Sequence, residues 1–408
     1  MKKRLTALAL IIFLFSSCSS KSDMVNKTVI EFPRSYSVKY NKTEEHEKRA
    51  VWFSYLDYEK TLEGLDEKSF SDKITSIFSE IKSFGFNTVI FQVRSHSDAI
   101  YSSKLYPASS LVSSELGGSI YYDPLKIAVN TAHEQGLKIE AWINPLRAHS
   151  EEEAENLSFD CAFKEWYDDE NKKGNNIVLC SGRWYYNPSV KEVRDFIASG
   201  VREICQNYDV DAIHIDDYFY PTTETYFDEI AFSNQTEFSS LEEFRKSSVS
   251  EMVKSIYSSV KEVNKDVEFG VSPQGNISNC VNKCYADVKL WCEQSGYIDY
   301  IAPQLYYSFK QSYMPFDKAL EEWQQIKFSD TVDFYVGLAA YKLCGRYTYS
   351  TEEERLDWSQ SRDMLSRQVS LSRNQKVYNG FMAFSYSHLF LENDEEINKE
   401  KEQLKTLL

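Results

Sequence analysis

Short apolar runs alternate with longer helical patterns from Arg49 almost to the end of the chain. Eight runs are rich in β-branched or aromatic residues: RAVWFSY, NTVIFQV, KIEAWIN, DAIHIDD, VEFGVS, DYIAPQLYY, DFYVGLAAY and GFMAFSY, which begin at Arg49, Asn87, Lys138, Asp211, Val267, Asp299, Asp333 and Gly380. Each run has the composition of a strand, and helical patterns separate the runs. The alternation predicts a parallel sheet built from strand–helix units.

The helices between these runs carry start and stop signals. SFSDKITSIFSEIKSFG opens with a Ser/Asp cap and closes on Gly85, and DPLKIAVNTAHEQG has Pro124 near its start and Gly136 at its end. Eight strands with seven crossovers in one domain favour an α/β fold of the (β/α)8 TIM-barrel type. An open doubly wound sheet is the alternative. It usually carries a Gly-rich loop after its first strand, and RAVWFSYLDYEK has none.

Two connections are longer than a helix requires, and both follow strands. They run from Pro145 to about Trp184, after the third strand, and from Tyr220 to about Leu241, after the fourth. In a barrel such loops follow the carboxyl ends of the strands, where substrates bind. We therefore expect long substrate-binding loops after strands 3 and 4.

Alternation along the strands indicates which side chains point into the barrel. In DAIHIDDYFYP, Ile213 and Ile215 suit the helix layer, so His214 and Asp216 point inward and Asp217 begins the loop. The same test on other strands gives further inward side chains: Gln92 and Arg94 on the second, Glu140, Trp142 and Asn144 on the third, and Gln304 and Tyr306 on the sixth. The candidate substrate-binding residues at this mouth are Arg94, Asn144, Arg147, His214, Tyr218, Gln274, Gln304 and Tyr306.

Some of these polar side chains also have structural interpretations. Glu140 and His214 lie one layer below the mouth and could satisfy each other, because polar groups in an apolar interior need partners. Arg94 could form an ion pair with Asp98 or Asp216. The convergence of several strands on one mouth is harder to explain by packing than any single residue.

The adjacent carboxylates Asp216 and Asp217 are the sharpest chemical feature of the chain. Glycosidic cleavage needs an acid for the leaving oxygen and an anion to stabilise positive charge at the anomeric carbon. Neighbouring residues do not flank a sugar from opposite faces, so the pair fits substrate-assisted retention. Asp216 would then orient a 2-acetamido group and Asp217 would be the general acid/base. Capping of the next turn or binding of a cation is the alternative.

Around these residues the chain resembles the bacterial glycosyl hydrolase-like 10 family of lipoproteins. The resemblance covers essentially the whole domain and is carried by RAVWFSY, FNTVIFQVRSHSDAIYSS, LKIEAWINPLRA, DAIHIDDYFYP, FGVSPQGN and YIDYIAPQLYYSF. It implies a TIM barrel and hydrolysis of peptidoglycan glycan strands, including strands stripped of peptides. It implies site roles for Arg94, Asn144, Asp216, Asp217, Gln274, Gln304 and Tyr306. The chain departs from relatives at Ser97, where Gly is common, and at Gln274-Gly275, where an aromatic residue or Phe-Gly is common.

The first residues, MKKRLTALALIIFLFSSCSS, have the layout of a secretory signal, with a basic start and an apolar run from Leu5 to Phe15. The end of the run resembles a lipobox in which Cys18 is lipidated; an ordinary signal peptide with a chance Cys is the alternative. We expect a signal peptide at 1–17, a flexible tether at 18–47 and a TIM-barrel glycoside hydrolase domain at 48–408. The anchor would be the only membrane contact and would hold the domain in the cell envelope, on the outer membrane of a Gram-negative host.

The charge balance limits the partners. The chain has 46 basic and 62 acidic residues and a net charge of −16, which argues against nucleic acid. Aromatic residues make up 15% of the chain, and Tyr and Trp suit stacking on sugar rings. There is no CxxC or HExxH motif, so we predict no metal site and no cofactor. We expect a monomer.

Seven cysteines follow Cys18, an odd number that cannot all pair, and their spacing allows two disulfides in an oxidising compartment. The pairs are Cys161 with Cys180 and Cys280 with Cys284, and the expected buried thiols are Cys205, Cys292 and Cys344.

The leading hypothesis is hydrolysis of an N-acetylhexosamine-containing glycan polymer, with peptidoglycan as the substrate. Another polysaccharide is the first alternative. A non-catalytic glycan-binding lipoprotein is the second, although such a protein could dispense with Asp217. A deacetylase is disfavoured because the usual His/Asp metal set is missing.

Overall fold

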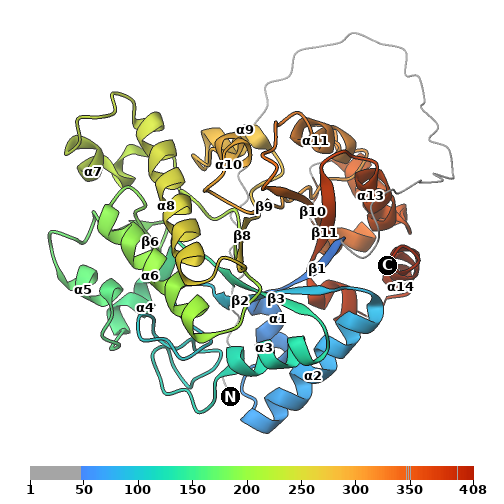
Figure 1. Cartoon of the computed structure of the whole chain (residues 1–408), viewed down its shortest axis with the longest axis horizontal. Helices are drawn as coiled ribbons and strands as arrows, with labels where there is room; N and C mark the ends of the chain where they lie inside the picture. Colours follow the sequence, from blue (N-terminus) through green and yellow to red (C-terminus); the bar gives the residue numbers. More distant parts are fainter. Residues whose placement is uncertain (1–46, 346, 348, 350, 393) are drawn as a thin grey trace. The chain divides into compact units, whose positions relative to one another are not determined.

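Eight parallel strands close into a barrel, as Figure 1 shows for the computed structural model, which describes residues 47–345, 347, 349, 351–392 and 394–408. The strand order is β1-β11-β10-β9-β8-β7-β3-β2. The strands are β1 (Lys48–Phe53), β2 (Thr88–Arg94), β3 (Lys138–Ile143), β7 (Ala212–Ile215), β8 (Glu268–Val271), β9 (Tyr300–Ile301), β10 (Asp333–Ala339) and β11 (Tyr378–Phe384). All eight predicted runs contribute a strand, which confirms the (β/α)8 TIM barrel.

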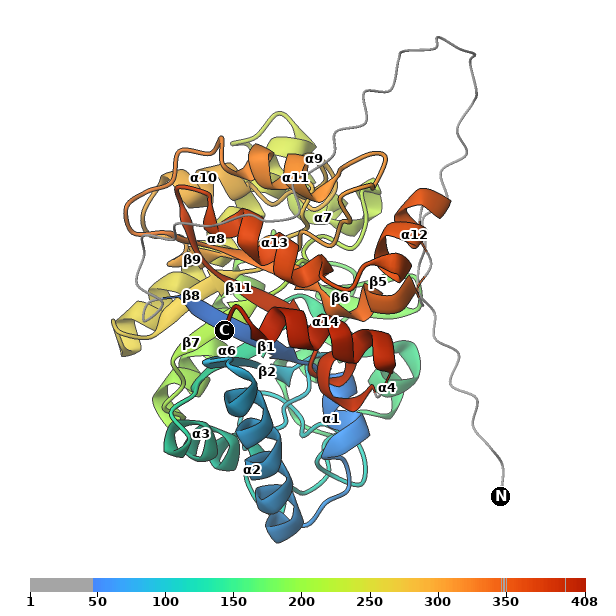
Figure 2. The same ribbon diagram turned by 90° about the vertical axis from the view of Figure 1, so that its right-hand side faces the viewer.

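Helices connect these strands. The principal ones are α1 (Tyr55–Thr61), α2 (Glu67–Phe84), α3 (Pro124–Glu134), α6 (Lys191–Asn207), α8 (Leu241–Val263), α10 (Val288–Glu293), α11 (Phe316–Trp323), α13 (Met364–Arg373) and α14 (Glu395–Lys405). Shorter helical segments lie in the connections: α4 (Glu151–Asn156), α5 (Ala162–Asp168), η2 (Thr225–Phe227), α7 (Glu229–Ser233), α9 (Ile277–Asn282), η3 (Ala340–Gly345), α12 (Glu352–Gln360) and η4 (Ser387–Leu391). In Figure 2, α13 lies along the β10–β11 side of the barrel, next to α14.

The helix caps follow the sequence signals with one shift. Helix α2 begins after Asp66, whose side chain accepts a hydrogen bond from the backbone N–H of Ser69, so the predicted Ser/Asp start lies inside the first turns. It ends on Gly85, which has a φ of 122° that suits glycine. Helix α3 has Pro124 in its first turn, as predicted.

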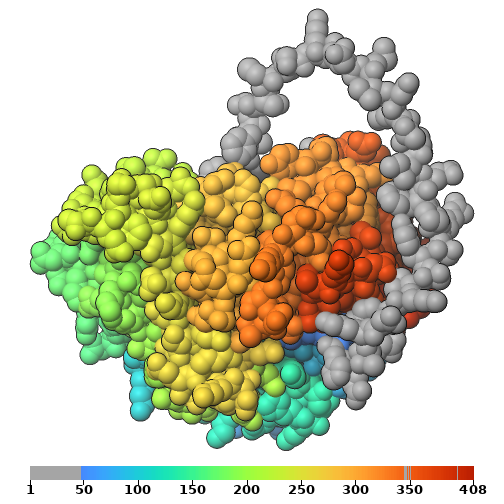
Figure 3. Space-filling model, turned by 45° about the horizontal axis from the view of Figure 1, so that its top comes forward, coloured from blue at the N-terminus to red at the C-terminus, as the bar shows by residue number. Residues whose placement is uncertain are grey.

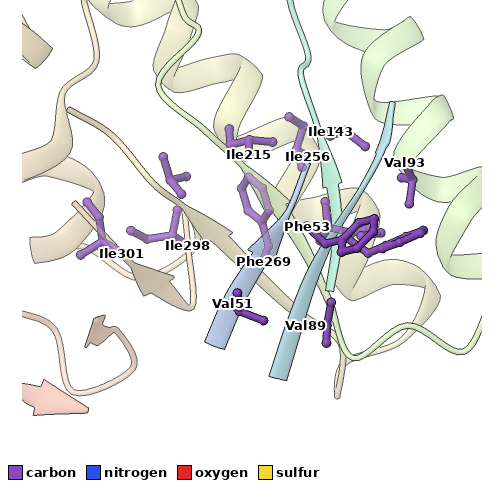
Figure 4. Close-up of a cluster of buried hydrophobic side chains, with 14 of the residues drawn as sticks. Val51, Phe53, Val89, Val93, Ile143, Ile215, Ile256, Phe269, Ile298 and Ile301 are labelled. Carbon is purple, nitrogen blue, oxygen red and sulfur yellow. The ribbon is translucent and has the colours of Figure 1, made fainter. Parts of the chain in front are cut away.

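The core has two layers, because side chains alternate along each strand. The outer layer lies between strands and helices, and Figure 4 shows part of it, including Val51, Val89, Ile215 and Phe269 on strands and Ile256 of α8. The inner layer fills the barrel with these side chains: Ala50, Trp52, Ile90, Trp142, Ala212, Tyr300, Ala302, Tyr335 and Met382. The barrel is therefore a packed core below its mouth.

A bulge in β2 overturns the predicted orientation of Arg94. Gln92 pairs with Trp142, but Arg94 pairs with Ile143, so Val93 is an extra residue that reverses the alternation. Arg94 consequently points outward. Its guanidinium donates to the hydroxyl of Tyr101 at 3.3 Å and lies 4.0 Å from the ring centre of Tyr106. Neither predicted ion pair, with Asp98 or with Asp216, is formed among the described residues.

The two long predicted loops have local structure and touch each other. The first contains an antiparallel sheet of β4 (Arg147–Ser150), β6 (Arg183–Tyr186) and β5 (Ile177–Cys180). The second contains η2 and α7. The side-chain amide of Asn187 donates to the carbonyl of Phe227 at 3.5 Å, which joins the two connections. They lie on the same side of the barrel in Figure 1, and their green and yellow-green surfaces adjoin in Figure 3.

Neither of the two disulfides that the spacing allows is present. The free thiols are Cys161, Cys180, Cys205, Cys280, Cys284 and Cys292. The thiol of Cys280 donates to the carbonyl of Gln274 at 3.1 Å, and Cys284 accepts from the side chain of Gln274 at 3.6 Å, so both fasten the loop after β8. Cys205 is only partly buried, contrary to expectation, and Cys292 is buried as expected. The expectation for the Cys344 side chain lies outside the described part of the structure.

The expectations for the signal peptide, the lipidated Cys18 and the tether also lie outside the described residues. Within the described ranges, no helix has the length and apolar character needed to cross a bilayer.

Candidate active site

Asp216 and Asp217 directly follow β7, at the carboxyl end of the barrel. The side-chain amide of Asn144 donates to both oxygens of Asp216, each at 2.7 Å, and the indole N–H of Trp142 donates to one of them at 3.2 Å. The backbone N–H of Tyr218 adds a fourth contact at 3.3 Å. Asp216 is only 5% exposed, so these donors replace the water that a carboxylate requires.

The orientation of Asn144 is set by a relay of amides. The backbone N–H of Tyr55 donates to Oε1 of Gln92 at 2.8 Å, and Nε2 of Gln92 donates to Oδ1 of Asn144 at 2.6 Å. With its oxygen already occupied as an acceptor, Asn144 presents its NH2 group to Asp216. The relay therefore orients Asn144 so that its NH2 group stabilises the ionised form of Asp216.

Asp217 has a different environment. It is partly buried, and Nε2 of Gln304 donates to its Oδ1 at 3.0 Å while also donating to the carbonyl of Ser272 at 3.0 Å. The side chain of Gln274 lies near Asp217 and favours its ionised form. Gly275 lets the loop after β8 approach Gln304, because a Cβ there would lie 2.5 Å from the Gln304 carbonyl oxygen. Asp217 thus receives fewer donors than Asp216.

The two carboxyls share a proton near neutral pH. Burial and then the charge of Asp217 raise the pKa of Asp216 to about 7, and burial raises the pKa of Asp217 as well. Such values belong to the pair, because ionisation of one carboxyl disfavours ionisation of the other. The donors around Asp216 stabilise its anion, so the shared proton is best held by Asp217.

His214 lies below this pair and is fully buried. Its Nε2 accepts from the indole of Trp52 at 3.2 Å, which leaves Nδ1–H to donate to the hydroxyl of Tyr300 at 2.8 Å. The same hydroxyl donates to Glu140 at 2.6 Å, and Glu140 pairs with Lys48 at 2.7 Å. This matches the structural interpretation of His214, with Tyr300 between it and Glu140. Burial lowers the pKa of His214 to about 3, so the ring stays neutral.

Aromatic side chains border the carboxylates. Tyr306 is partly buried and lies with its ring centre 5.6 Å from that of Tyr341, and the charges of both aspartates act on its hydroxyl. Tyr218 is 48% exposed, and the guanidinium of Arg147 lies 4.6 Å from its ring centre. A mouth that combines paired carboxylates with flat apolar faces suits a sugar chain.

The sequence profile described as Glycosyl hydrolase-like 10 matches residues 47–353. The chain belongs to this family. Glycosyl hydrolase YngK of Bacillus subtilis strain 168 is 30% identical over 372 residues, which cover 86% of this chain and 70% of that protein. Glycosyl hydrolase DigH of Escherichia coli K12 is 30% identical over 292 residues, 64% of each protein. By family, the chain is a glycoside hydrolase.

Solved structures with the same fold are more distant. The PgaB (BpsB) glycoside hydrolase domain from Bordetella bronchiseptica has a TM-score of 0.54 at 10% identity, covering 88% of this chain and 98% of that one. The catalytic domain of beta-amylase from Paenibacillus polymyxa has a TM-score of 0.51 at 12% identity, covering 89% and 98%. At these identities the likeness concerns the fold alone.

One departure from glycosyl hydrolase-like 10 relatives has a structural explanation. Ser97 has a φ of 62°, in the left-handed region that favours glycine. Its hydroxyl hydrogen-bonds that of Tyr186, on β6. This contact ties the loop after β2 to the inserted sheet and helps to hold Ser97 in that conformation.

The structure brings most of the candidate residues together in this family member. Asn144, Arg147, Tyr218, Gln274, Gln304 and Tyr306 surround the Asp pair, whereas His214 lies beneath it and Arg94 lies behind the sheet. Gln92 is not among the candidate substrate-binding residues, although the alternation along the second strand indicates that its side chain points into the barrel. Arg183 is not among them either, because it stands in the inserted sheet, where the barrel pattern offers no guide. Among the described residues, no three His, Cys, Asp or Glu side chains are arranged to hold a metal.

Proposed function

We propose that this glycoside hydrolase cleaves N-acetylhexosamine-containing glycan strands and that peptidoglycan is its substrate. The observation that supports the proposal is the unequal environment of two adjacent carboxyls. Four donor contacts converge on Asp216, whereas Asp217 is more open and receives its side-chain hydrogen bond from Gln304. One carboxyl is thus suited to remain an anion and the other to carry a proton.

This division of roles fits substrate-assisted cleavage. Asp217 would give its proton to the glycosidic oxygen as that bond breaks, while the carbonyl oxygen of the 2-acetamido group bonds to the anomeric carbon. Asp216 would accept a hydrogen bond from the acetamido N–H and stabilise its developing positive charge. Asp217, now ionised, would then remove a proton from the water that opens the oxazoline. Overall retention of configuration follows from the two displacements.

The substrate proposal draws on the mouth and on the chain's likeness to its relatives. Tyr218 and Tyr306 offer ring faces beside the carboxylates, as stacking on sugars requires. The resemblance noted above implies peptidoglycan strands. Lipidation at Cys18 would raise the local concentration of the domain near a cell-wall polymer.

Release of reducing ends from purified peptidoglycan tests the proposal. Strands with and without peptides should both be offered to wild type, to Asp217→Asn and to Asp209→Asn, a control at a 91% exposed position before β7. Loss of an acid/base group lowers the rate by about 10²–10⁴-fold, so Asp217→Asn should be nearly inactive and Asp209→Asn normal. Failure of wild type to release reducing ends from either substrate would contradict the proposal.

A thiazoline analogue of N-acetylglucosamine separates substrate-assisted cleavage from other mechanisms. It mimics the oxazoline, so it should inhibit wild type much more strongly than N-acetylglucosamine does. Asp216→Asn should lose this preference, because the amide cannot supply the negative charge. Equal inhibition by the two compounds in wild type would count against the mechanism while leaving glycan cleavage intact.

We also propose that the domain is held in the cell envelope by a lipid on Cys18. Growth of the native host with a clickable palmitate should label the wild-type protein and leave Cys18→Ala unlabelled. Labelling of both proteins, or of neither, would contradict the anchor.

A further inference from the structure

Positively charged side chains gather on one side of the mouth, although the chain as a whole is acidic. Arg147 lies on β4 opposite Tyr185 of β6, and Arg183 is two residues from Tyr185 on the same strand. Residues two apart share a face of a sheet, so both guanidinium groups lie on one face. The charge of Arg147, after burial, lowers the pKa of Arg183.

His96 joins these arginines from the loop after β2. Burial lowers the pKa of its imidazole well below the usual range, and Arg147 and Arg183 are the next causes. Its ring packs edge-on against Tyr55, with 5.2 Å between the ring centres, and its Nδ1 contacts the hydroxyl of Ser95 at 2.9 Å. The lowered pKa keeps the His96 ring neutral beside the two positive charges. We call Arg147 and Arg183, together with the neutral His96, the cation cluster.

The charge of the cation cluster is poorly neutralised. Within the described part of the chain, no carboxylate lies within 4.0 Å of the Arg147 guanidinium and no hydrogen bond engages it; its close contact is the ring of Tyr218. Arg183 donates to the carbonyl of Ala148 at 2.6 Å, and its nearest carboxylate, that of Glu153, is 3.9 Å away. By contrast, the buried Arg245 makes a 2.6 Å ion pair with Asp228.

The cluster lies beside the catalytic pair. Burial raises the pKa of both Asp216 and Asp217, and the charge of Arg147 acts on both in the opposite direction. Tyr218, which Arg147 covers, is the next residue in the chain. The side chain of Arg183 is 26% exposed. A ligand that occupied the mouth would therefore meet two guanidinium groups with unused donors.

We propose that the cation cluster is a subsite for a carboxylate carried by a sugar next to the cleaved bond. A guanidinium presents donors in a planar fork that matches a carboxylate, and such bonds are strong when partly shielded from water. The inference rests on the proposed function, because it assigns a group of the glycan to this side of the same mouth. The carboxylate could belong to a lactyl ether, as in muramic acid, or to a uronic acid.

Chemical conversion of the carboxylate tests the subsite. Glycan strands with free lactyl carboxylates are compared with the same strands after conversion of those groups to methylamides. Wild type should prefer the carboxylate form by about tenfold to a hundredfold in kcat/KM, as expected for one to two charge-assisted hydrogen bonds. In Arg183→Gln this ratio should fall towards one. Arg202→Gln, on α6 and paired with Glu262, is the matched control and should keep the wild-type ratio.

The pKa of His96 distinguishes carboxylate binding from a purely structural role of the two arginines, because only a bound carboxylate would change it. Binding of N-acetylmuramic acid should raise the pKa of His96, because the new anion offsets the two arginines, whereas the methylamide of that sugar should leave it unchanged. N-acetylglucosamine oligomers and oligomers that contain glucuronic acid, added separately, distinguish a lactyl source from a uronic source. The imidazole signals can be followed by nuclear magnetic resonance.

The outcomes separate the two proposals. Cleavage of both strand forms at equal kcat/KM by wild type would overturn the subsite and leave the proposed function standing. If wild type cleaves neither form, the proposed function fails, and the His96 titration alone decides the subsite. An unchanged His96 pKa in the presence of saturating carboxylate sugar would then overturn it.

Discussion

The side-chain amide of Asn144 donates to both carboxylate oxygens of Asp216 at 2.7 Å. A neutral donor that contacts both oxygens favours the ionised form of the acid, and Asn144 accordingly lowers the pKa of Asp216 against the effect of burial. Asn144 is thus a positioning residue for the catalytic anion.

Replacement of Asn144 should change the pH dependence of activity. In Asn144→Ala the anion of Asp216 loses its main donor, so the pH–rate profile should move to higher pH by about one unit, and kcat should fall about tenfold or more. Asn156→Ala, which removes only a local contact on α4, is the control. A normal profile with a reduced kcat would show that Asn144 does not set the ionisation of the pair.

The Asp216–Asp217 pair should reduce the stability of the fold as pH rises. The pKa of about 7 for Asp216 beside Asp217 belongs to the pair, against 3.8 for an ordinary Asp, so the folded pair keeps a proton that the unfolded chain releases between these values. Stability therefore falls from about pH 4 to pH 7 and levels off above, with an expected loss on the order of a few kcal/mol.

Urea unfolding of Asp216→Asn at pH 4.5 and pH 8 measures this effect. The variant should gain stability relative to wild type at pH 8 compared with pH 4.5, although it is inactive. Asp209→Asn should show no such change between the two pH values. A pH-independent difference between Asp216→Asn and wild type would mean that the pair ionises as two ordinary aspartates do.

Arg245 should be essential for the connection after β7. It bonds Asp228 with two nitrogens, donates to the carbonyls of Thr223 and Glu224, and is 1% exposed. Its removal leaves the buried carboxylate of Asp228 without its charged partner, with the hydroxyl of Tyr220 still donating to it at 3.1 Å, so Arg245→Ala should lose about 3–5 kcal/mol in free energy of unfolding. Arg202→Ala, at an exposed pair, should lose about 0–1 kcal/mol. Similar losses in the two variants would contradict the assigned role.

Gly270 on β8 should tolerate no side chain. A Cβ at this position would lie 1.9 Å from the ring of Tyr300, which fills the barrel below the active site. Gly270→Ala should therefore lower the melting temperature markedly, since overpacking costs about 1–3 kcal/mol or more. Addition of Tyr300→Leu should recover part of the loss if the clash is the cause; a further independent loss would argue for another cause.

The strands could be predicted because successive side chains of a barrel strand point alternately into the barrel and towards the helices. The two apolar layers therefore leave a regular pattern in the sequence. For this reason the sequence predicts inward side chains at Gln92, Asn144 and Asp216. Alternation no longer indicates where a side chain points once a bulge or a proline interrupts the strand. An extra residue in β2 reverses Arg94, and β9 extends over only Tyr300–Ile301, because Pro303 cannot donate to a neighbouring strand.

Contacts between distant segments were not readable from the sequence. The spacing of Cys280 and Cys284 allows a disulfide between them, but both thiols contact Gln274 instead. Likewise, Arg183 belongs to a short antiparallel strand whose position follows from tertiary pairing with β4. Such positions depend on the fold and not on local propensity.

The extra residue in β2 also turns Arg94 outward at the point where the strand ends and the next loop begins. Arg94 and Tyr106 pack so closely on α6 that a Cβ at Gly200 would lie 2.7 Å from the Arg94 guanidinium, and this contact fastens the start of the loop from outside. We therefore expect a change in the length of the loop after Tyr106 to leave the eight strands in register. Substrate preference can then change at this wall of the mouth while the catalytic pair is kept.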